Sequence, residues 1–139
     1  MEKNNSKIRI RGVVNKDYLF LYNLLKERKP RANISHKRMP SYSQHIKFVN
    51  SHPYTKWYII EKGDEKVGSA YLSKQNEIGI FLKKKFQGEG IGSTVLDFII
   101  KRNSRKRYLA NINPKNEKSI SFFKQNKFRL IQYTFELNK

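Results

Sequence analysis

The chain reads Gln87-Gly88-Glu89-Gly90-Ile91-Gly92 between an apolar strand pattern that ends near Leu82 and an amphipathic helix pattern that starts near Ile91. Glycine carries no Cβ, so such a loop lets backbone N–H groups approach a ligand closely. The start of the following helix adds a positive dipole end, which attracts phosphate. The stretch therefore predicts a diphosphate cradle, with the alternative that it only connects a strand to a helix.

The glycine spacing excludes two other phosphate loops. The dinucleotide fingerprint needs two residues between its last two glycines, whereas a single residue separates Gly90 from Gly92. A Walker loop needs Gly-Lys followed by Ser or Thr, and none follows here. A phosphate cradle at this loop would therefore belong to neither of these two classes.

Outward from the loop, hydrophobic periodicity predicts short strands and helices in alternation. The expected strands cover residues 7–13, 57–60, 66–72, 77–82, 108–112 and 128–137, the last as a strand or a hairpin. The expected helices start at Asn15, at Ser41 in a capping box with Gln44, near Ile91, and at Asn116, with a loop over 29–40. The order β α α β β β α β α β is that of a mixed α/β fold. The length of 139 residues predicts a single domain over 1–139.

The composition indicates a globular protein with anionic partners. Thirty Lys and Arg against 11 Asp and Glu give a formal net charge of +19. Nucleic acid, a phosphorylated small ligand and a mere compositional bias are the three explanations, and no RNP, zinc-finger or basic-zipper pattern favours nucleic acid. The chain has no cysteine, which excludes disulfides and a thiolate nucleophile. No stretch approaches the roughly 20 apolar residues of a membrane span, so we expect a cytoplasmic protein that does not contact the membrane.

Two motifs in the right order resemble a known family. Gln87, Gly90 and Gly92 form Gln-x-x-Gly-x-Gly, which looks like the signature of the GNAT superfamily of acyl-CoA N-acyltransferases. Residues 116–128 resemble its Asn-x-x-Ser-x-x-Phe-Tyr-x-x-x-Gly-Phe segment. The resemblance covers residues 55–130 well and residues 1–54 only through element order.

The resemblance implies a central, mostly antiparallel sheet that is flanked by helices and splayed where acetyl-CoA binds. It implies acetyl-CoA as co-substrate and no metal. The implied CoA-binding residues come from the end of a strand, the glycine loop and the last helix. They are Phe81, Leu82, Lys83, Gln87, Gly88, Glu89, Gly90, Ile91, Gly92, Ser93, Asn116, Ser119 and Phe123.

The chemistry that the resemblance implies is direct attack of an amine on the thioester. Glu77 is the expected catalytic base, and a half-buried cleft would raise its pKa toward neutrality. The alternative is a solvated glutamate or one paired with a lysine. Two positions depart from the family: Phe123 replaces the usual tyrosine acid, and Lys127 replaces a glycine, where we expect Asn126 to take the left-handed conformation.

The acceptor is the least determined part. His36 and Tyr71 are expected at the acceptor site, and His45 is expected to be a hydrogen-bonded core or rim histidine. The positive charge favours an anionic acceptor such as an amino sugar on a nucleotide diphosphate over a polyamine, and a protein N-terminus or an antibiotic stays open. The alternatives to an enzyme are a basic nucleic-acid-binding module and a CoA-binding regulatory protein without catalysis. The sequence leaves both a monomer and a homodimer open.

Overall fold

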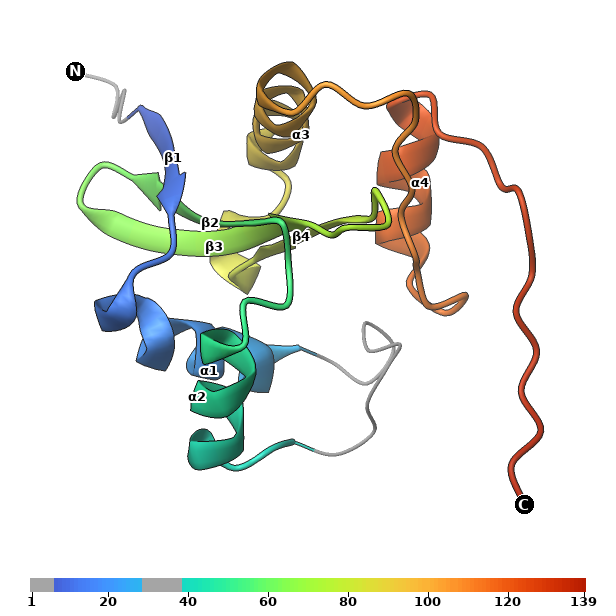
Figure 1. Ribbon diagram of the computed structural model, residues 1–139. Coiled ribbons are helices and arrows are strands. Elements are labelled where there is room, and N and C mark those ends of the chain that lie inside the picture. Colours follow the sequence, from blue (N-terminus) through green and yellow to red (C-terminus); the bar gives the residue numbers. More distant parts are fainter. Residues whose placement is uncertain (1–6, 29–38) are drawn as a thin grey trace.

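The computed structural model describes residues 7–28 and 39–139 (Figure 1), so the expected acceptor residue His36 lies outside the described residues. A four-stranded sheet with the strand order β1-β2-β3-β4 forms the centre, and each neighbouring pair is antiparallel. The strands are β1 (Ile8–Gly12), β2 (Lys56–Lys62), β3 (Glu65–Leu72) and β4 (Ile78–Leu82). This mixed α/β arrangement confirms the fold class.

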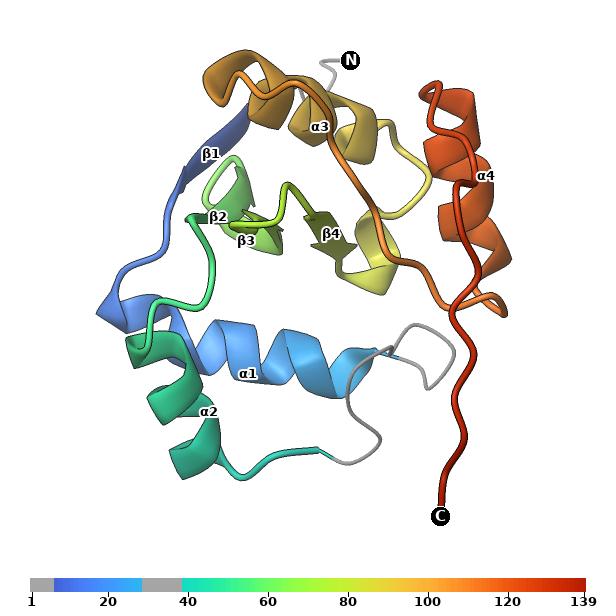
Figure 2. The same cartoon turned by 45° about the vertical axis from the view of Figure 1, so that its right-hand side comes forward.

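Helices cover both faces of the sheet (Figures 1 and 2). Helices α1 (Tyr18–Glu27) and α2 (Tyr42–Asn50) lie on one face and α3 (Ile91–Arg102) on the other. Helix α4 (Glu117–Gln125) stands beyond β4, and the 3-10 helices η1 (Asn15–Asp17) and η3 (Lys84–Phe86) precede α1 and the glycine loop. A sheet covered on both faces needs strands with consecutive apolar residues. Tyr58, Ile59 and Ile60 of β2 are accordingly all buried.

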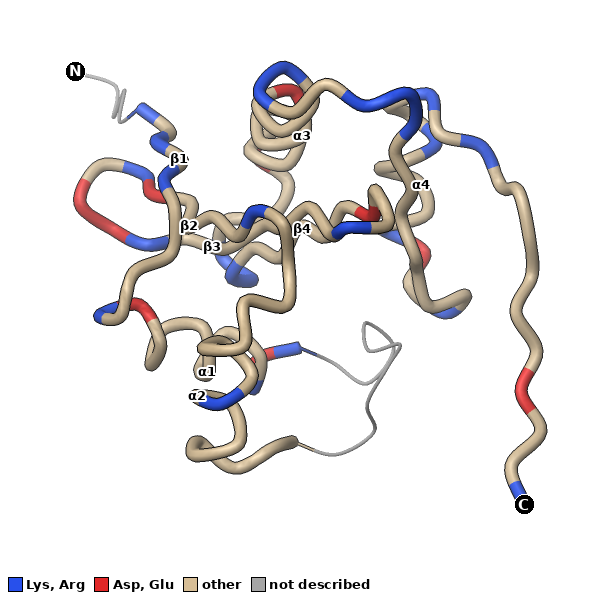
Figure 3. The backbone as a smooth tube through the Cα atoms, viewed as in Figure 1, with Lys and Arg blue, Asp and Glu red and all other residues tan. Residues whose placement is uncertain are grey.

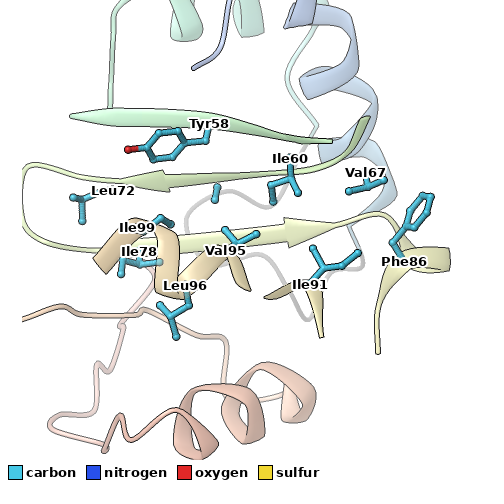
Figure 4. Close-up of a cluster of buried hydrophobic side chains, with 11 residues drawn as sticks. Tyr58, Ile60, Val67, Leu72, Ile78, Phe86, Ile91, Val95, Leu96 and Ile99 are labelled. Carbon is cyan, nitrogen blue, oxygen red and sulfur yellow. The ribbon is translucent and has the colours of Figure 1, made fainter. Parts of the chain in front are cut away.

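The larger core lies between the sheet and α3 (Figure 4). Ile60, Val67 and Leu72 from the sheet meet Val95 and Ile99 from α3, and all five are fully buried. On the opposite face, a smaller cluster joins Leu21 of α1, Val49 of α2 and Ile59 of β2. Because successive strand residues point to opposite faces, neighbouring positions 59 and 60 serve the two cores in turn. The sheet is therefore held from both sides, and its β4 edge has a fixed position.

Three of the four expected helix starts are confirmed, including that of α3 at Ile91, and one is wrong. Ser41 and Gln44 form the expected reciprocal capping box, and the Asn116 side chain accepts from the Ser119 N–H at 3.3 Å. The prediction of Asn15 as an N-cap is wrong, because residues 15–17 form a 3-10 turn ahead of α1. The N-cap of this 3-10 helix is Val14, whose N–H donates to the buried Asp17 carboxylate at 2.8 Å.

Two expected strands are not formed as strands. Segment 108–112 is reduced to one parallel bridge between Leu109 and Glu77, with Ile78 N–H donating to Leu109 and Leu109 N–H to Asn76, both at 2.8 Å. Residues 128–137 carry no assigned strand, and everything from Arg129 onward is exposed. A strand needs a partner along its length, and neither segment has one among the described residues. The apolar pattern of these two segments is typical of strands, but a pattern alone does not form a strand when no partner strand is present.

Candidate functional site

The glycine loop has the backbone conformation of an anion cradle. Gly88 and Gly90 adopt positive φ angles of 82° and 84°, a region that side chains rarely occupy, and a Cβ at either position would point into open space. Gly90 is the N-cap of α3, and no described side chain caps it. Thr94 is the first residue whose N–H bonds back to Gly90, so the preceding N–H groups of Ile91, Gly92 and Ser93 are available to a ligand. Phosphate is the group that such a helix start binds.

Side chains in and around the loop fix its shape. Gln87 donates its side-chain amide to the Leu82 carbonyl at 3.1 Å, while its backbone N–H donates to Lys84. Glu89 pairs with Lys62 of β2 at 3.0 Å. Gly92 lies against Phe122 of α4, where a Cβ would stand 3.1 Å from the ring. The available donors thus begin at Gly88, and Gln87 and Glu89 hold the loop against the sheet.

Next to the loop, β4 offers an open edge. The pairing with segment 108–112 occurs only at Leu109, and no backbone hydrogen bond joins residues 110–112 to β4 in the described part of the chain. Ile78 uses its N–H on this edge, so alternation places the N–H groups of Ile80 and Leu82 there as well. An extended ligand with amide groups can pair with such an edge as a peptide strand does. The parting of the two segments is the splay that the sequence resemblance implies.

A cavity of about 400 Å³ lies beside this edge, between the sheet and α1, α2 and α4. Its walls combine residues from segments far apart in the sequence. The expected residues Phe81, Asn116, Ser119, Phe123 and Tyr71 line it, and so do Arg28, His45, Tyr54, Trp57 and Asn111. The structure therefore brings the strand end, the last helix and Tyr71 to one place.

Aromatic rings and one guanidinium shape the part of the cavity next to α1. The Tyr54 and Tyr71 rings stack with centroids 3.9 Å apart and an angle of 5° between their planes. Gly79 makes room for Tyr71, since a Cβ at Gly79 would stand 2.3 Å from that ring. The Arg28 guanidinium lies over the Phe81 ring, 4.0 Å from its centroid. This wall can receive an apolar or planar group and an anion beside it.

Burial changes the titration of three groups in this wall. Desolvation raises the pKa of Tyr71, so its phenol stays protonated well above neutral pH. Burial lowers the pKa of Arg28, although a guanidinium stays charged at any physiological pH. Burial also lowers the pKa of His45, whose Nε2 is buried without a hydrogen-bond partner. His45 is thus buried as expected, yet not hydrogen-bonded at Nε2, and its ring centroid lies 5.3 Å from that of Tyr22.

Glu77 lies at the rim, immediately before β4. Its carboxylate accepts from the Ser73 hydroxyl at 3.1 Å and from the Asn111 side-chain amide at 2.8 Å. Asn111 lines the cavity, whereas Glu77 is not among the lining residues. The carboxylate is therefore held by two neutral donors rather than by a lysine, and one of these donors, Asn111, lines the cavity.

The two departures from the family pattern have clear structural forms. Phe123 is 8% exposed and packs edge-on against Phe122 and Phe128, so no hydroxyl exists at this position to protonate a leaving group. Lys127 itself adopts the left-handed conformation with a φ of 74°, while Asn126 has a φ of −96°. The expectation for Asn126 is wrong, because the Asn126 side chain instead bonds the Phe122 carbonyl at 2.8 Å as part of the helix end.

Arg28, Tyr54 and Asn111 escaped the sequence reasoning. Arg28 ends α1 and meets Phe81 of β4, a contact between positions more than fifty residues apart that no local pattern reveals. Tyr54 follows Pro53 in a stretch without periodicity. Only Asn111 had a usable signal, since it is a polar residue inside the otherwise apolar run 108–112.

The sequence model of the acetyltransferase (GNAT) family matches residues 18–128. The chain therefore belongs to the GNAT family of acetyltransferases, as the two motifs suggested. Family members transfer acetyl groups from acetyl-CoA, so the chain is an acyltransferase with acetyl-CoA as its co-substrate. The family match and the cradle together disfavour a basic nucleic-acid-binding module.

Solved structures share the fold. A domain from Methanocaldococcus jannaschii is 26% identical, with a TM-score of 0.77 over 95% of this chain and 94% of that one. A ribosomal-protein alpha-N-acetyltransferase in complex with coenzyme A is 20% identical, with a TM-score of 0.73 over 92% and 82%. A spermidine N-acetyltransferase from Vibrio cholerae, in complex with CoA and spermine, is 18% identical, with a TM-score of 0.72 over 87% and 80%. No match was found among curated proteins.

Among the described residues, no group of three or more His, Cys, Asp or Glu side chains is placed to hold a metal ion. No helix in the described ranges has the length and apolar character needed to cross a bilayer.

Proposed function

We propose that the protein transfers the acetyl group of acetyl-CoA to a primary amine by direct attack, and that the amine belongs to an anionic small molecule. The observation that carries the first part is the glycine loop, whose open N–H groups lie next to an open strand edge. The loop would hold the CoA diphosphate through Gly88 to Ser93. The N–H groups of Ile80 and Leu82 would pair with the pantetheine amides, and Asn116, Ser119 and Phe123 would line its other side.

Glu77 is the proposed general base. Attack needs the neutral amine, so a proton must leave the ammonium before the new C–N bond forms and the C–S bond breaks. Glu77 does not line the cavity, whereas its hydrogen-bond partner Asn111 does, and we therefore assign proton removal to Glu77 through an intervening water. The two neutral donors, Ser73 and Asn111, orient the carboxylate without cancelling its charge. No covalent enzyme intermediate is required, which suits a chain without cysteine.

Tyr71 is the proposed proton donor to the leaving thiolate. Phe123 cannot serve, and the raised pKa of Tyr71 keeps a phenolic proton available in the cavity. Its ring is fixed by stacking on Tyr54 and by the space at Gly79. A thiolate with a pKa of roughly 8.5 also leaves tolerably without help, so removing the Tyr71 hydroxyl should slow the reaction only modestly.

The proposal of an anionic acceptor is based on the positive charge of the protein. Figure 3 shows Lys and Arg on strands, helices and connections alike, in keeping with the net charge of +19. This field repels polyamines and attracts phosphates or carboxylates. Within the cavity, Arg28 supplies a fixed positive group over Phe81, suited to bind a phosphate or carboxylate in two-point fashion. An amino sugar carried on a nucleotide diphosphate is the acceptor we propose, with its base or sugar against the aromatic wall and His36 as a further contact.

A thiol-release assay tests both parts of the proposal. Nucleotide-linked amino sugars, amino acids, spermidine and short peptides are each offered with acetyl-CoA, and free CoA is measured. We expect turnover with an anionic amine and little with spermidine. Turnover of spermidine above every anionic acceptor would contradict the acceptor class, and no turnover or acetyl-CoA binding at all would contradict the activity.

A further inference from the structure

A cluster of basic residues lies at an end of the fold that is outside the candidate site. Five of the seven residues in segment 101–107 are Lys or Arg, a density that is typical of contacts with nucleic acid or another polyanion. Figure 3 shows Lys and Arg at the C-terminal ends of α3 and α4 and on the connection after α3, all toward the top of that view. We call the exposed members of this cluster the basic end: Lys101, Arg102, Lys106, Arg107, Lys124 and Lys127.

The charges of the basic end are not balanced from within the fold. Segments 101–107 and 124–127 contain no Asp or Glu. None of the six side chains forms a salt bridge among the described residues, and Asp97, one turn before Lys101 on α3, does not pair with it. The C-terminal dipoles of two helices attract cations, but together they amount to roughly one negative charge. The six positive charges therefore exceed what the helix ends account for.

The connection after α3 holds its cations on an ordered backbone. The Tyr108 hydroxyl accepts from the Arg105 N–H at 3.0 Å and donates to the Asn103 carbonyl at 2.5 Å. The Asn103 side-chain amide donates to the Tyr58 hydroxyl at 3.1 Å. The Arg105 guanidinium donates to the Asn76 side chain at 2.6 Å. Because these bonds already fix the connection, a ligand that binds its exposed cations loses little affinity to the ordering of the backbone.

The basic end is separate from the proposed CoA cradle. The cradle lies at the start of α3, near Ile91, whereas the basic end begins in the last turn of that helix. At 1.5 Å per residue, Ile91 and Lys101 are about 15 Å apart along the helix axis. None of the six residues lines the cavity either. A ligand of the basic end would therefore bind in addition to acetyl-CoA and the acceptor.

The composition of the basic end matches a phosphate backbone better than a membrane or stacked bases. Surfaces that bind membranes combine cations with apolar side chains that enter the lipid. Proteins that hold single strands by their bases present aromatic rings for stacking. Segments 101–107 and 124–127 contain no apolar and no aromatic residue. Lys and Arg alone contact phosphates and carry no sequence information.

We propose that the basic end binds the phosphate backbone of a nucleic acid without sequence preference, as a second binding surface of this acyltransferase. RNA and DNA share the chemistry that it would recognise, and the test below distinguishes them. The proposal differs from a nucleic-acid-binding module without catalysis, because the family match makes the chain an enzyme. It does not depend on the acceptor. Six phosphate contacts should give a plot of log K against log salt concentration with a slope of about −5 on a duplex.

The first test is fluorescence anisotropy with a labelled RNA hairpin and a DNA hairpin of the same sequence, each over a series of salt concentrations. We expect saturable binding, with a Kd of roughly 1–100 μM at physiological salt and the steep slope given above. The tighter of the two hairpins identifies the source of the phosphates. Absence of binding to both hairpins at low salt overturns the proposal.

The second test locates the surface with two variants of equal net charge. One variant replaces three lysines of the basic end: Lys101→Gln, Lys106→Gln and Lys124→Gln. The matched control replaces three exposed lysines of other segments: Lys16→Gln, Lys47→Gln and Lys56→Gln. The first variant should reduce the steepness of the salt dependence by about 3 units and weaken binding at least about 10-fold, since each phosphate contact contributes roughly 0.9 to the slope. The control should stay within a few-fold of wild type. Equal losses in the two variants would assign binding to overall charge and overturn the proposal.

The third test asks which ligands compete for the basic end. Saturating acetyl-CoA should leave hairpin binding unchanged, because the cradle lies at the other end of α3. Displacement by acetyl-CoA would place the nucleic acid in the CoA site and overturn the proposal. Vesicles with anionic phospholipid, or polyglutamate, that bind as tightly as the hairpins would assign the surface to a membrane or to an acidic protein and would overturn it too. Circular dichroism and acetyl-CoA binding confirm that every variant is folded, and no readout here requires acetyl transfer.

Discussion

The two parts of the candidate site, the glycine loop and the cavity next to α1, present different kinds of binding groups. At the proposed CoA end, the ligand would be held by backbone N–H groups of consecutive residues, arranged by the positive φ angles of Gly88 and Gly90. At the proposed acceptor end, the contacts would come from side chains of distant segments, such as Arg28 at the C-cap of α1 and Tyr71 of β3. The co-substrate is common to the family, whereas the acceptor differs between members. A site made of backbone N–H groups keeps its binding groups when neighbouring side chains are substituted. A site made of side chains changes its specificity when a single one of them is substituted.

This comparison predicts that the two ends can be damaged separately. Variants of the glycine loop should weaken acetyl-CoA binding and leave acceptor binding unchanged. Variants of the residues that line the cavity next to α1, such as Arg28, Tyr54 and Tyr71, should weaken acceptor binding and leave acetyl-CoA binding unchanged. Glu77 lies between the ends and should affect neither affinity. The following predictions, ordered by expected size, test that separation.

Glu77→Gln should lower kcat by roughly 100-fold or more, which is the usual contribution of general base catalysis. The amide keeps the shape and can still meet Ser73 and Asn111, so the affinity for acetyl-CoA should not change. Steady-state kinetics and calorimetry measure the two quantities. The control is Asp97→Asn. A kcat within a few-fold of wild type at saturating acceptor would remove Glu77 from the chemistry.

Arg28→Gln should raise KM for an anionic acceptor by roughly 10- to 100-fold, since a hydrogen bond to a charged group contributes about 1.5–3 kcal/mol. Arg28→Lys should recover part of the loss, because lysine keeps the charge but not the two-point geometry. Binding of acetyl-CoA should be unaffected. Lys47→Gln, an exposed lysine on α2, controls for the change in net charge. A loss of acetyl-CoA affinity in Arg28→Gln equal to its loss for acceptor would break the separation of the two ends.

Gly90→Val should raise the Kd for acetyl-CoA about 10-fold, because a side chain in the left-handed region costs about 1–2 kcal/mol. The new side chain would also project into the open space above the loop. KM for the acceptor, measured at saturating acetyl-CoA, should stay near the wild-type value. Gly12→Val is the matched control, since Gly12 also has free space around it but no positive φ. An unchanged Kd in Gly90→Val would mean that the diphosphate lies elsewhere.

Lys127→Gly should stabilise the protein by about 1 kcal/mol, because glycine adopts the positive φ of this position without strain. Activity should not change, since Lys127 lies outside the cavity. Chemical denaturation measures the effect. Lys124→Gly, three residues earlier and inside α4, should destabilise by a similar amount. A destabilised Lys127→Gly would contradict the assigned backbone conformation.

The sequence predicts best what depends on neighbours along the chain. The Ser41–Gln44 capping box, the glycine loop and strands β2 to β4 are local patterns, and the structure confirms them. Segments 108–112 and 128–137 have equally good strand patterns but lack partners, and a pattern cannot show whether a partner exists. The Arg28–Phe81 contact and the Tyr54–Tyr71 stack join distant positions, so the acceptor wall could not be read from the sequence.

An amide NMR titration with acetyl-CoA tests the central claim most directly. The backbone N–H signals of Gly88 to Ser93, together with those of Ile80 and Leu82, should show the largest shifts and saturate together at one equivalent. Exposed lysines such as Lys84 and Lys118 should respond less at the backbone. Saturable binding that leaves the amides of the glycine loop unmoved would contradict the claim that these N–H groups hold the co-substrate.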